Sequence, residues 1–431
     1  MGEHGLRDAA WKNGSVIPLV GRSSVGERRH SLRVGCCGRR LKTESSRTRS
    51  TEVRSWVARP NARPCADRRQ ADTDARARRG SGQRRGYSLA MRRAVILAGT
   101  GAIGLAAARQ LTGAGYDVIV TGRDPTRVPP SLTATGARFV PGDRHDPATL
   151  PAVLAAGADL VVDCACYTAA HARSLLTYLG GVTSTVMISS KAVYVDADGR
   201  HSNSAVSPHF DAPITEEQPT LRPNGANYDS PEGYGAHKVA AEEVLLASDH
   251  PVTVLRPSKV HGSGSRQPRE WYFVKRALDH RPAVLLARRG AGADHPSAAL
   301  NIAALIQRVA DRPGRRVLNV ADPDCPDGRT IASIVADQMG HTWEEILLDD
   351  DAPAGLGHHP WDRVPRVELD TAAAVRLGYT PAGDYATTVR DEIQWLVDVA
   401  TGAHPGIVLD RWSPGPRDYA LEDDYRRRHG E

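Results

Sequence analysis

The stretch MRRAVILAGTGAIGLAAARQL, residues 91–111, decides the fold class of this chain. Its apolar run at 94–98 is typical of a buried parallel strand. Three glycines follow, Gly99, Gly101 and Gly104, in G-x-G-x-x-G spacing, and a helical pattern of apolar residues comes after them. A strand, a glycine turn and a helix in this order predict a nucleotide-binding domain.

We expect the turn to bind the pyrophosphate of a dinucleotide. Glycine allows a tight turn and a close approach of the backbone, and the free N–H groups at the start of the helix attract negative charge. A tight turn without any ligand is the alternative, because glycine spacing alone is a weak signal. The residues predicted to contact the cofactor here are Gly99, Gly101, Ala102, Ile103 and Gly104.

Further apolar runs repeat this rhythm along the chain, with segments rich in Ala and Leu between them. Alternating strands and helices predict a parallel sheet that helices cover on both faces. We therefore predict an α/β fold, a Rossmann-type doubly wound parallel sheet with a smaller C-terminal substrate lobe. The runs lie at 117–121, 138–140, 159–163, 185–189 and 252–255.

The first ninety residues differ in composition from the rest. Residues 1–90 contain 21 Lys and Arg against 8 Asp and Glu, so they carry +13 and the remainder −7, which gives the net charge of +6. They lack any apolar periodicity, so we expect a disordered basic segment that is not part of the native fold. A nucleic-acid-binding arm and a transit peptide are alternatives. We prefer a third interpretation, upstream sequence translated ahead of a start at Met91.

Composition limits the remaining classes. No apolar run approaches the roughly 18 residues of a membrane-spanning helix, so no membrane partner is expected. Six irregularly spaced cysteines form neither a disulfide framework nor a zinc pattern, which favours a cytoplasmic protein without a metal site. No specific nucleic-acid partner is expected, and a homodimer is left open. The predicted domains are a dinucleotide-binding domain at 91–265, a substrate lobe at 266–400 and a tail at 401–431.

The end of the second strand predicts which dinucleotide binds. An acidic residue there suits the ribose 2′-hydroxyl of NAD, and an arginine suits the 2′-phosphate of NADP. Arg123 comes first in the sequence Thr-Gly-Arg-Asp at 121–124, which favours NADP over NAD. In the alternative, Arg123 is a solvated turn residue and Asp124 accepts from the hydroxyl.

The chemistry is predicted from one serine and one helix. Ser190 follows the fifth strand, and YGAHK at 234–238 places Tyr234 and Lys238 one helical turn apart. A phenol is a poor acid or base at neutral pH, but a nearby ammonium favours the phenolate and lowers its pKa. The serine hydroxyl can bind the same substrate oxygen. A solvated helix face is the alternative for the Tyr–Lys pair taken alone.

These motifs resemble the extended short-chain dehydrogenase/reductases of the NAD-dependent epimerase/dehydratase family. The resemblance extends from residue 91 to about 400. The stretches that carry it are AGTGAIG (98–104), GD (142–143), SSKAVY (189–194), YGAHK (234–238) and LRPSKVHGSG (255–264).

The resemblance implies a role for each matching residue. Tyr234 would be the acid/base, Ser190 would polarise the carbonyl, and Lys238 would also bind the nicotinamide ribose. Asp143 would lie near the adenine and Pro257 near the nicotinamide.

The chain also departs from the family. Ala98 stands where the family has its first loop glycine, and Lys191-Ala192 follow Ser190 where sugar-nucleotide dehydratases carry Asp-Glu. Dehydration is therefore disfavoured. The predicted function is an NAD(P)-dependent oxidoreductase or epimerase that acts on a hydroxyl or keto carbon of a small molecule, such as a nucleotide sugar. A non-catalytic dinucleotide-sensing or RNA-associated protein on the same fold is the alternative.

Overall fold

The computed structural model describes most of the chain after residue 90. Two short strands precede that part, β1 (Trp11–Lys12) and β2 (Ser15–Val16), and they pair antiparallel. Our other expectations for residues 1–90 lie outside the described residues. The described residues are 11–12, 15–16, 91–350, 353–404, 406–409, 413 and 415–429.

A seven-stranded parallel sheet forms the centre of the fold, in the order β12-β8-β7-β6-β3-β4-β5. The chain begins in the middle of the sheet, moves outward through β4 and β5, and then returns to the other side of β3. The strand order therefore reverses between β3 and β6, where doubly wound sheets bind ligands. The strands are β3 (Arg93–Leu97), β4 (Asp117–Gly122), β5 (Arg138–Pro141), β6 (Ala158–Asp163), β7 (Val182–Ile188), β8 (Val252–Pro257) and β12 (Arg316–Val320).

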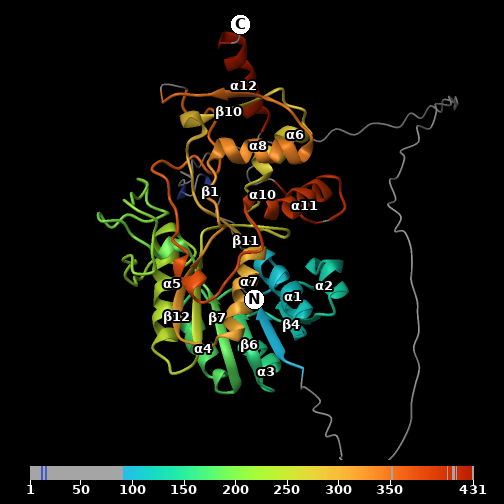
Figure 1. Ribbon diagram of the computed structural model, residues 1–431, viewed down its shortest axis with the longest axis vertical. Helices are drawn as coiled ribbons and strands as arrows, with labels where there is room; N and C mark the ends of the chain where they lie inside the picture. Colours follow the sequence, from blue (N-terminus) through green and yellow to red (C-terminus); the bar gives the residue numbers. More distant parts are fainter. Residues whose placement is uncertain are drawn as a thin grey trace, which may run out of the picture. The chain divides into compact units, whose positions relative to one another are not determined.

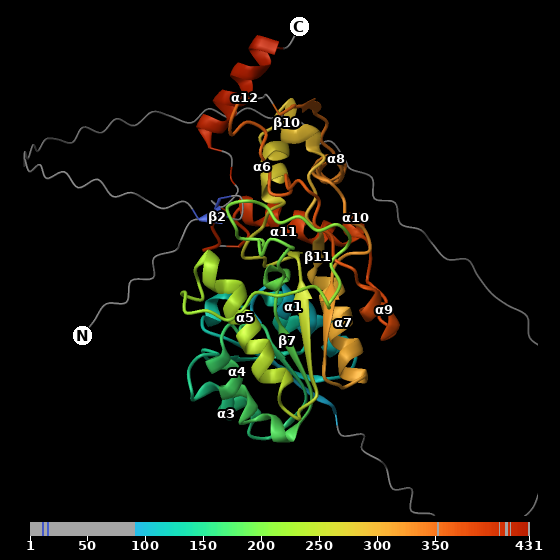
Figure 2. The same cartoon turned by 90° about the vertical axis from the view of Figure 1, so that its left-hand side faces the viewer.

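Helices cover both faces of this sheet because side chains alternate along each strand. Ala94 and Ile96 face one helical layer, and Val95 and Leu97 face the other. Figure 2 shows α7 on one side of the sheet and α4 and α5 on the other. The first layer contains α1 (Ala102–Gly113), α2 (Pro130–Ala134), α7 (Ala299–Asp311) and α9 (Ala372–Arg376), and the second α3 (Thr149–Leu154), α4 (Ala169–Leu176) and α5 (Pro231–Leu246).

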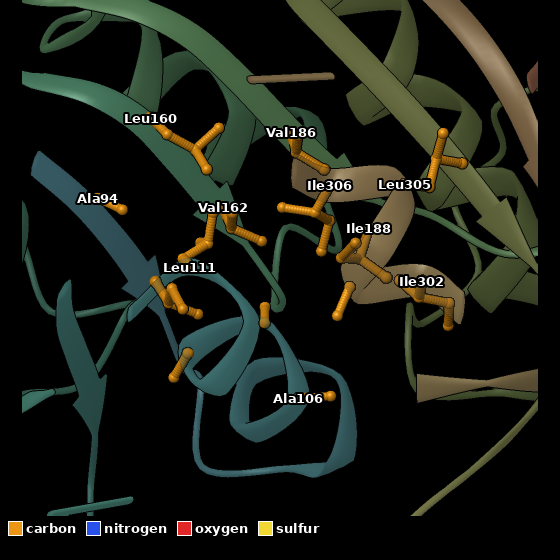
Figure 3. Close-up of a cluster of buried hydrophobic side chains, with 14 of the residues drawn as sticks. Ala94, Ala106, Leu111, Leu160, Val162, Val186, Ile188, Ile302, Leu305 and Ile306 are labelled. Carbon is orange, nitrogen blue, oxygen red and sulfur yellow. The ribbon is translucent and has the colours of Figure 1, made fainter. Parts of the chain in front are cut away.

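The core of the first layer is apolar and fully buried. Ile302 and Ile306 of α7 lie against Val186 and Ile188 of β7, and Leu111 of α1 lies beside Val162 (Figure 3). Burying such a side chain stabilises the fold by about 1.5–3 kcal/mol. Helices α1 and α7 together cover the strands that end at the predicted site.

A smaller lobe follows the sheet and has its own core, which contains Trp271, Phe273 and Trp361. Figure 1 shows its elements grouped beyond the carboxyl ends of the sheet strands. Short parallel pairs β9–β11 and β10–β13 belong to this part of the chain. Its elements are β9 (Lys259–His261), α6 (Trp271–Leu278), β10 (Ala283–Leu286), β11 (Pro296–Ala298), α8 (Gly328–Met339), β13 (Glu344–Leu347), α10 (Tyr385–Thr388), α11 (Arg390–Ala400) and α12 (Pro416–His429). Short 3-10 helices are η1 (Pro125–Arg127), η2 (Leu179–Gly181), η3 (Lys191–Val193) and η4 (Ala287–Gly290).

The fold class is confirmed, and two details differ from the expectation. The seventh strand β12 and the helix α7 come from the stretch that we assigned to the substrate lobe, because an apolar pattern marks a strand without saying which sheet it joins. The stretch 401–431 contains the helix α12, whose buried Glu422 pairs with Arg276 at 2.5 Å. Among the described residues, no helix is both long and apolar enough to cross a membrane.

Candidate functional site

The glycine turn after β3 is shaped by two close contacts and one open position. A Cβ on Gly99 would lie 2.6 Å from the Ile96 side chain, and a Cβ on Gly104 would lie 2.3 Å from the backbone of Gly99. A Cβ on Gly101 would meet no atom within 4 Å. Packing therefore requires Gly99 and Gly104, whereas Gly101 keeps the space in front of the turn clear.

Ala98, which replaces the glycine expected in the first position, adopts a left-handed backbone with φ of 52°. A residue with a Cβ is strained there by roughly 1–2 kcal/mol. The Ala98 N–H donates to Thr121 Oγ1 at 3.0 Å, which helps to hold this conformation. Ala98 therefore adopts the left-handed backbone conformation that glycine favours, although it carries a Cβ.

The helix α1 begins directly at this turn. Gly101 is its N-cap and offers no side-chain cap, so the first-turn N–H groups of Ala102 and Ile103 are available for a ligand. The loop after β9 lies beside them, because a Cβ on Gly264 would be 3.7 Å from the Ala102 nitrogen. The predicted phosphate-binding residues are therefore next to one another at the helix N-terminus.

The two residues after β4 have different surroundings. The Arg123 side chain is exposed at the end of the strand. Asp124 caps η1, and its Oδ1 accepts from the N–H of Thr126 at 2.9 Å and from its hydroxyl at 2.6 Å. Asp124 is thus engaged in a local turn, while Arg123 extends into solvent.

At the end of β5, Asp143 lies near the surface and its Oδ1 accepts from the His145 N–H at 2.9 Å. The next residue, Arg144, forms a buried ion pair with Asp163 at the end of β6, with 2.6 Å between the charged atoms. Its guanidinium also donates to the carbonyl of His171 at 2.9 Å. This pair fixes the loop of Asp143 to the end of β6, which is separated from β5 by β4 and β3.

Two histidines stack beside this ion pair. The rings of His145 and His171 lie 4.1 Å apart at 18°. Burial, together with the neighbouring His145 and Arg144, lowers the pKa of His171 to about 4. His171 Nδ1 accepts from the N–H of Tyr167 at 3.3 Å, so its ring orders the segment after β6.

The structure brings Ser190 and Tyr234 together. Ser190 caps η3 just after β7, and its Oγ accepts from Ala192 N–H at 3.1 Å. Tyr234 lies in α5, whose neighbouring Gly235 permits close packing, since a Cβ there would lie 2.4 Å from the Ala192 carbonyl oxygen. Burial raises the pKa of Tyr234, and a hydrogen bond from Ser190 lowers it in part.

Lys238 has partners other than the expected one. Its ammonium donates to the carbonyls of Cys166 at 2.9 Å and Ile188 at 2.8 Å, and it lies 4.5 Å from the centre of the Tyr167 ring. The charge of Lys238 acts on the pKa of Tyr167, whereas the pKa of Tyr234 is raised. We expected the ammonium to lower the Tyr234 pKa, and the direction in this structure is the opposite because burial dominates.

Pro257 ends β8 at the same edge of the sheet and pairs in register with Val320 of β12. The preceding Arg256 donates to Glu242 of α5, with the shorter contact at 2.5 Å. The Ser189 hydroxyl donates to the same carboxylate. Glu242 therefore ties β7, β8 and α5 together beneath the predicted catalytic residues.

Lys191 belongs to a group that we name the cationic cluster, formed by Lys191, Lys259 and Arg363 around the buried Asp294. Lys191 Nζ contacts one carboxylate oxygen of Asp294. Lys259 Nζ at 3.3 Å and Arg363 Nε at 3.5 Å contact the other. Three basic side chains thus share one carboxylate, and burial, with the nearby cations, lowers the pKa of Lys191 and Lys259 well below the usual lysine value.

Tyr167 and Asp163, the partner of Arg144, were not predicted from the sequence. Both Tyr167 and Asp163 lie at the carboxyl end of β6, where the strand order reverses, and that position is the signal that could have identified them. A hollow of about 500 Å³ is lined by residues that include Pro213, Asp322 and Leu369 and by none of the predicted site residues.

Comparisons with known proteins agree with this architecture. Residues 94–290 match the model of the NAD dependent epimerase/dehydratase family. No curated protein matches the chain.

Several solved structures share the fold. UDP-glucose-4-epimerase from Stenotrophomonas maltophila, with bound NAD and formylated UDP-arabinopyranose, is 19% identical with a TM-score of 0.56 over 72% of this chain and 99% of its own. UDP-glucose 4-epimerase from Thermotoga maritima, with UDP-glucose, is 17% identical with a TM-score of 0.54 over 72% and 99%. dTDP-glucose 4,6-dehydratase from Bacillus anthracis, in complex with NAD, is 16% identical with a TM-score of 0.55 over 72% and 98%.

Proposed function

We propose that the chain, whose residues 94–290 match the model of the NAD dependent epimerase/dehydratase family, is an NAD(P)-dependent oxidoreductase or epimerase. Its target is a hydroxyl or keto carbon of a small molecule. The observation that carries the proposal is that close packing of α5 on η3 brings Tyr234 to Ser190 at the carboxyl edge of the sheet that also bears the glycine turn.

The glycine turn fits a dinucleotide. The clear space at Gly101 admits a pyrophosphate, and the N–H groups that begin α1 face that space. A bound nicotinamide cofactor supplies hydride acceptance and return. Gly99, Ile103 and Gly104 shape the phosphate site, Asp143 binds on the adenine side, and the residues at the nicotinamide end are Pro257 and Lys238.

The chain's own residues supply the proton and hold the substrate. In the direction of reduction, Tyr234 donates its phenolic proton to the carbonyl oxygen of the substrate, and Ser190 donates a second hydrogen bond to that oxygen. In the direction of oxidation, Tyr234 must be in its phenolate form, and the proton of the substrate hydroxyl passes to that phenolate oxygen. Lys238 donates to the carbonyls of Cys166 and Ile188 and so holds the segments after β6 and at the end of β7 together.

NADP is the proposed cofactor in preference to NAD. Arg123 is exposed after β4, where a 2′-phosphate would lie, and a charge-assisted hydrogen bond contributes about 1.5–3 kcal/mol. Asp124, which would otherwise accept from a ribose hydroxyl, already accepts from Thr126. NADPH is therefore expected to bind more tightly than NADH.

A nucleotide sugar is the proposed substrate. UDP-glucose is bound to one structure of the same fold, and its diphosphate suits the basic side chains of the cationic cluster beside Ser190. Lys191 occupies the position where dehydratases have an acid, and it is paired with Asp294. Epimerisation or reduction is therefore favoured over elimination of water.

The test uses purified full-length protein and removes one hydroxyl. Tyr234→Phe should lower turnover of a responsive nucleotide sugar by about 10²–10⁴-fold, which is the usual effect of losing a positioned proton donor. Binding of NADPH and NADH, followed by thermal shift, should hardly change. Tyr228→Phe is the matched control, because it removes an exposed phenolic hydroxyl from the same region and should leave turnover intact.

Two results would contradict the proposal. Wild-type turnover in the Tyr234→Phe variant would exclude Tyr234 as the proton donor. Tight cofactor binding without turnover on a panel of ketones and nucleotide sugars would instead favour a dinucleotide-sensing protein.

A further inference from the structure

Three buried side chains from separate segments meet outside the proposed catalytic site. His261 ends β9, Glu270 precedes α6, and Glu392 lies in the first turn of α11. One ligand atom from each lies within 4.8 Å of the other two, and each side chain is at most 2% exposed. With Asp322, which contacts His261, we name this group the acidic cluster.

The imidazole of His261 is oriented by one nitrogen and open at the other. Its Nε2 lies 2.7 Å from Asp322 Oδ2, and Asp322 accepts further hydrogen bonds from Ala298 N–H at 2.6 Å and Asn301 Nδ2 at 2.8 Å. Because a carboxylate only accepts, Nε2 carries the proton. The lone pair of Nδ1 then points to Glu392 Oε2, 4.0 Å away, and Nδ1 has no hydrogen-bond partner among the described residues.

The two glutamates are also incompletely satisfied. Glu392 Oε2 accepts from Gly262 N–H at 2.5 Å, but its Oε1 has no donor among the described residues. Glu270 accepts from the Tyr385 hydroxyl at 3.2 Å. A histidine nitrogen and two carboxylates therefore converge with electron pairs facing one another, which is costly unless a cation or protons lie between them.

The net negative charge of the acidic cluster and Arg269 equals in magnitude the charge that a divalent cation carries. When all three are ionised, Glu270, Glu392 and Asp322 contribute three negative charges, and Arg269 is close enough to interact electrostatically with Glu392. With a neutral His261, two negative charges remain in a buried site. A divalent cation balances them, whereas protons could do so only by occupying both the imidazole and the carboxylate pair.

We propose that His261 Nδ1, Glu270 and Glu392 bind a divalent transition-metal ion, with Asp322 holding the imidazole in place. Imidazole and carboxylate ligands suit Zn²⁺ and Mn²⁺, and a carboxylate behind a ligating histidine is a common second partner. A tetrahedral zinc site places ligand atoms roughly 3.3 Å apart, so ligand atoms that now lie within 4.8 Å of one another must approach by up to about 1.5 Å.

The ion would join two distant parts of the chain. His261 and Glu270 flank the loop whose Gly264 lies against the start of α1, and Glu392 belongs to α11. Binding would therefore fix α11 to the loop beside the glycine turn. This role is structural and does not depend on the proposed reaction.

The experiment measures metal binding by the full-length protein. The purified protein is analysed for metal content, treated with a chelator, and titrated with ZnCl₂ or MnCl₂ by calorimetry and thermal unfolding. One equivalent should bind, and the Tm should rise by several degrees because the ion binds the folded state. Glu392→Gln and His261→Asn should each weaken binding by at least about 100-fold.

Glu216→Gln is the matched control, since Glu216 is a partly buried carboxylate that accepts from Asn319 N–H in another part of the fold. It should bind metal as the wild type does. The proposal is overturned if the wild type contains no metal and binds neither ion up to millimolar concentration. It is also overturned if Glu392→Gln binds metal as tightly as Glu216→Gln. The wild-type titration decides the matter even if a variant fails to fold.

Discussion

The cationic cluster and the acidic cluster handle buried charge in opposite ways. In the first, Asp294 is one carboxylate among three cations. In the second, Glu270, Glu392 and Asp322 surround one histidine.

In these two clusters, unlike the buried ion pairs elsewhere in the fold, the ionic groups are not neutralised pair by pair. Removing charges from water costs several kcal/mol for each ion, and unbalanced charges recover less of that cost. The Arg144–Asp163 pair, which is balanced one to one, offers the reference case. An excess of one sign therefore marks the two places where the molecule is prepared for ligands of the opposite sign.

The largest effect is expected from Asp294→Asn. This variant leaves Lys191, Lys259 and Arg363 without their shared carboxylate, and breaking a buried ion pair destabilises a protein by about 3–5 kcal/mol. Urea unfolding of the wild type and the variant measures the difference. Asp117→Asn, at an exposed pair with Arg138, is the control and should cost about 0–1 kcal/mol. Equal costs at the two positions would remove the distinction between buried and exposed charge.

The same substitution in the acidic cluster should cost less. Asp322→Asn keeps an acceptor for Ala298 N–H and removes one charge from a group that has an excess of them, so we expect about 1–3 kcal/mol. It should also weaken Zn²⁺ binding by about 10–100-fold, because the imidazole of His261 loses its orienting carboxylate. A cost as large as that of Asp294→Asn would show that the sign of the excess charge does not matter.

The smallest effect is expected beside the balanced pair. The pKa of His171 is lowered to about 4 by burial, with His145 and Arg144 adding to the shift, so the unfolded chain binds more protons between pH 4 and 6.5. The stability contributed by the neutral ring is complete above pH 6.5 and is lost as the pH falls toward 4. Partial exposure reduces the contribution to about 1 kcal/mol. Thermal unfolding of the wild type and His171→Gln across this range should give a shallower slope for the variant, and identical slopes would contradict the assignment.

The layered fold could be predicted because its signals are local. The glycine turn at 98–104 and six apolar strands follow one another in the sequence, and each carries its own pattern. The strand Arg316–Val320 was expected in the smaller lobe, because periodicity identifies a strand but not its neighbours. Its pairing with β8, which is about 60 residues earlier in the chain, places it in the central sheet.

The site could be predicted only in part, because many of its contacts join residues that are far apart in the sequence. Tyr234 and Lys238 lie one turn apart, so their spacing is visible in the sequence, and packing of α5 on η3 brings Tyr234 to Ser190. The partners of Lys238 could not be predicted, because Cys166 and Ile188 contribute carbonyl groups, which every residue has. The catalytic roles assigned to Ser190, Tyr234 and Lys238 remain predictions.

The acidic cluster illustrates the limit most clearly. His261, Glu270 and Glu392 come from a strand, a loop and a distant helix, and no spacing relates them. We expected no metal site because cysteine and histidine spacings gave no pattern. Only the packing of α11 near β9 places the third carboxylate beside the other two.

Because α7 follows β8 in the sequence, one face of the central sheet lacks this helix for part of the synthesis of the chain. Val186, Ile188 and Leu255 are in place once β8 has left the ribosome, yet α7, which packs on the same face of the sheet, begins only at Ala299 (Figure 3). At about 5–20 residues per second, the interval lasts several seconds. During that time the nascent chain exposes the apolar face of the sheet that α7 later covers. We therefore expect chaperones to bind mainly between the emergence of β8 and that of α7.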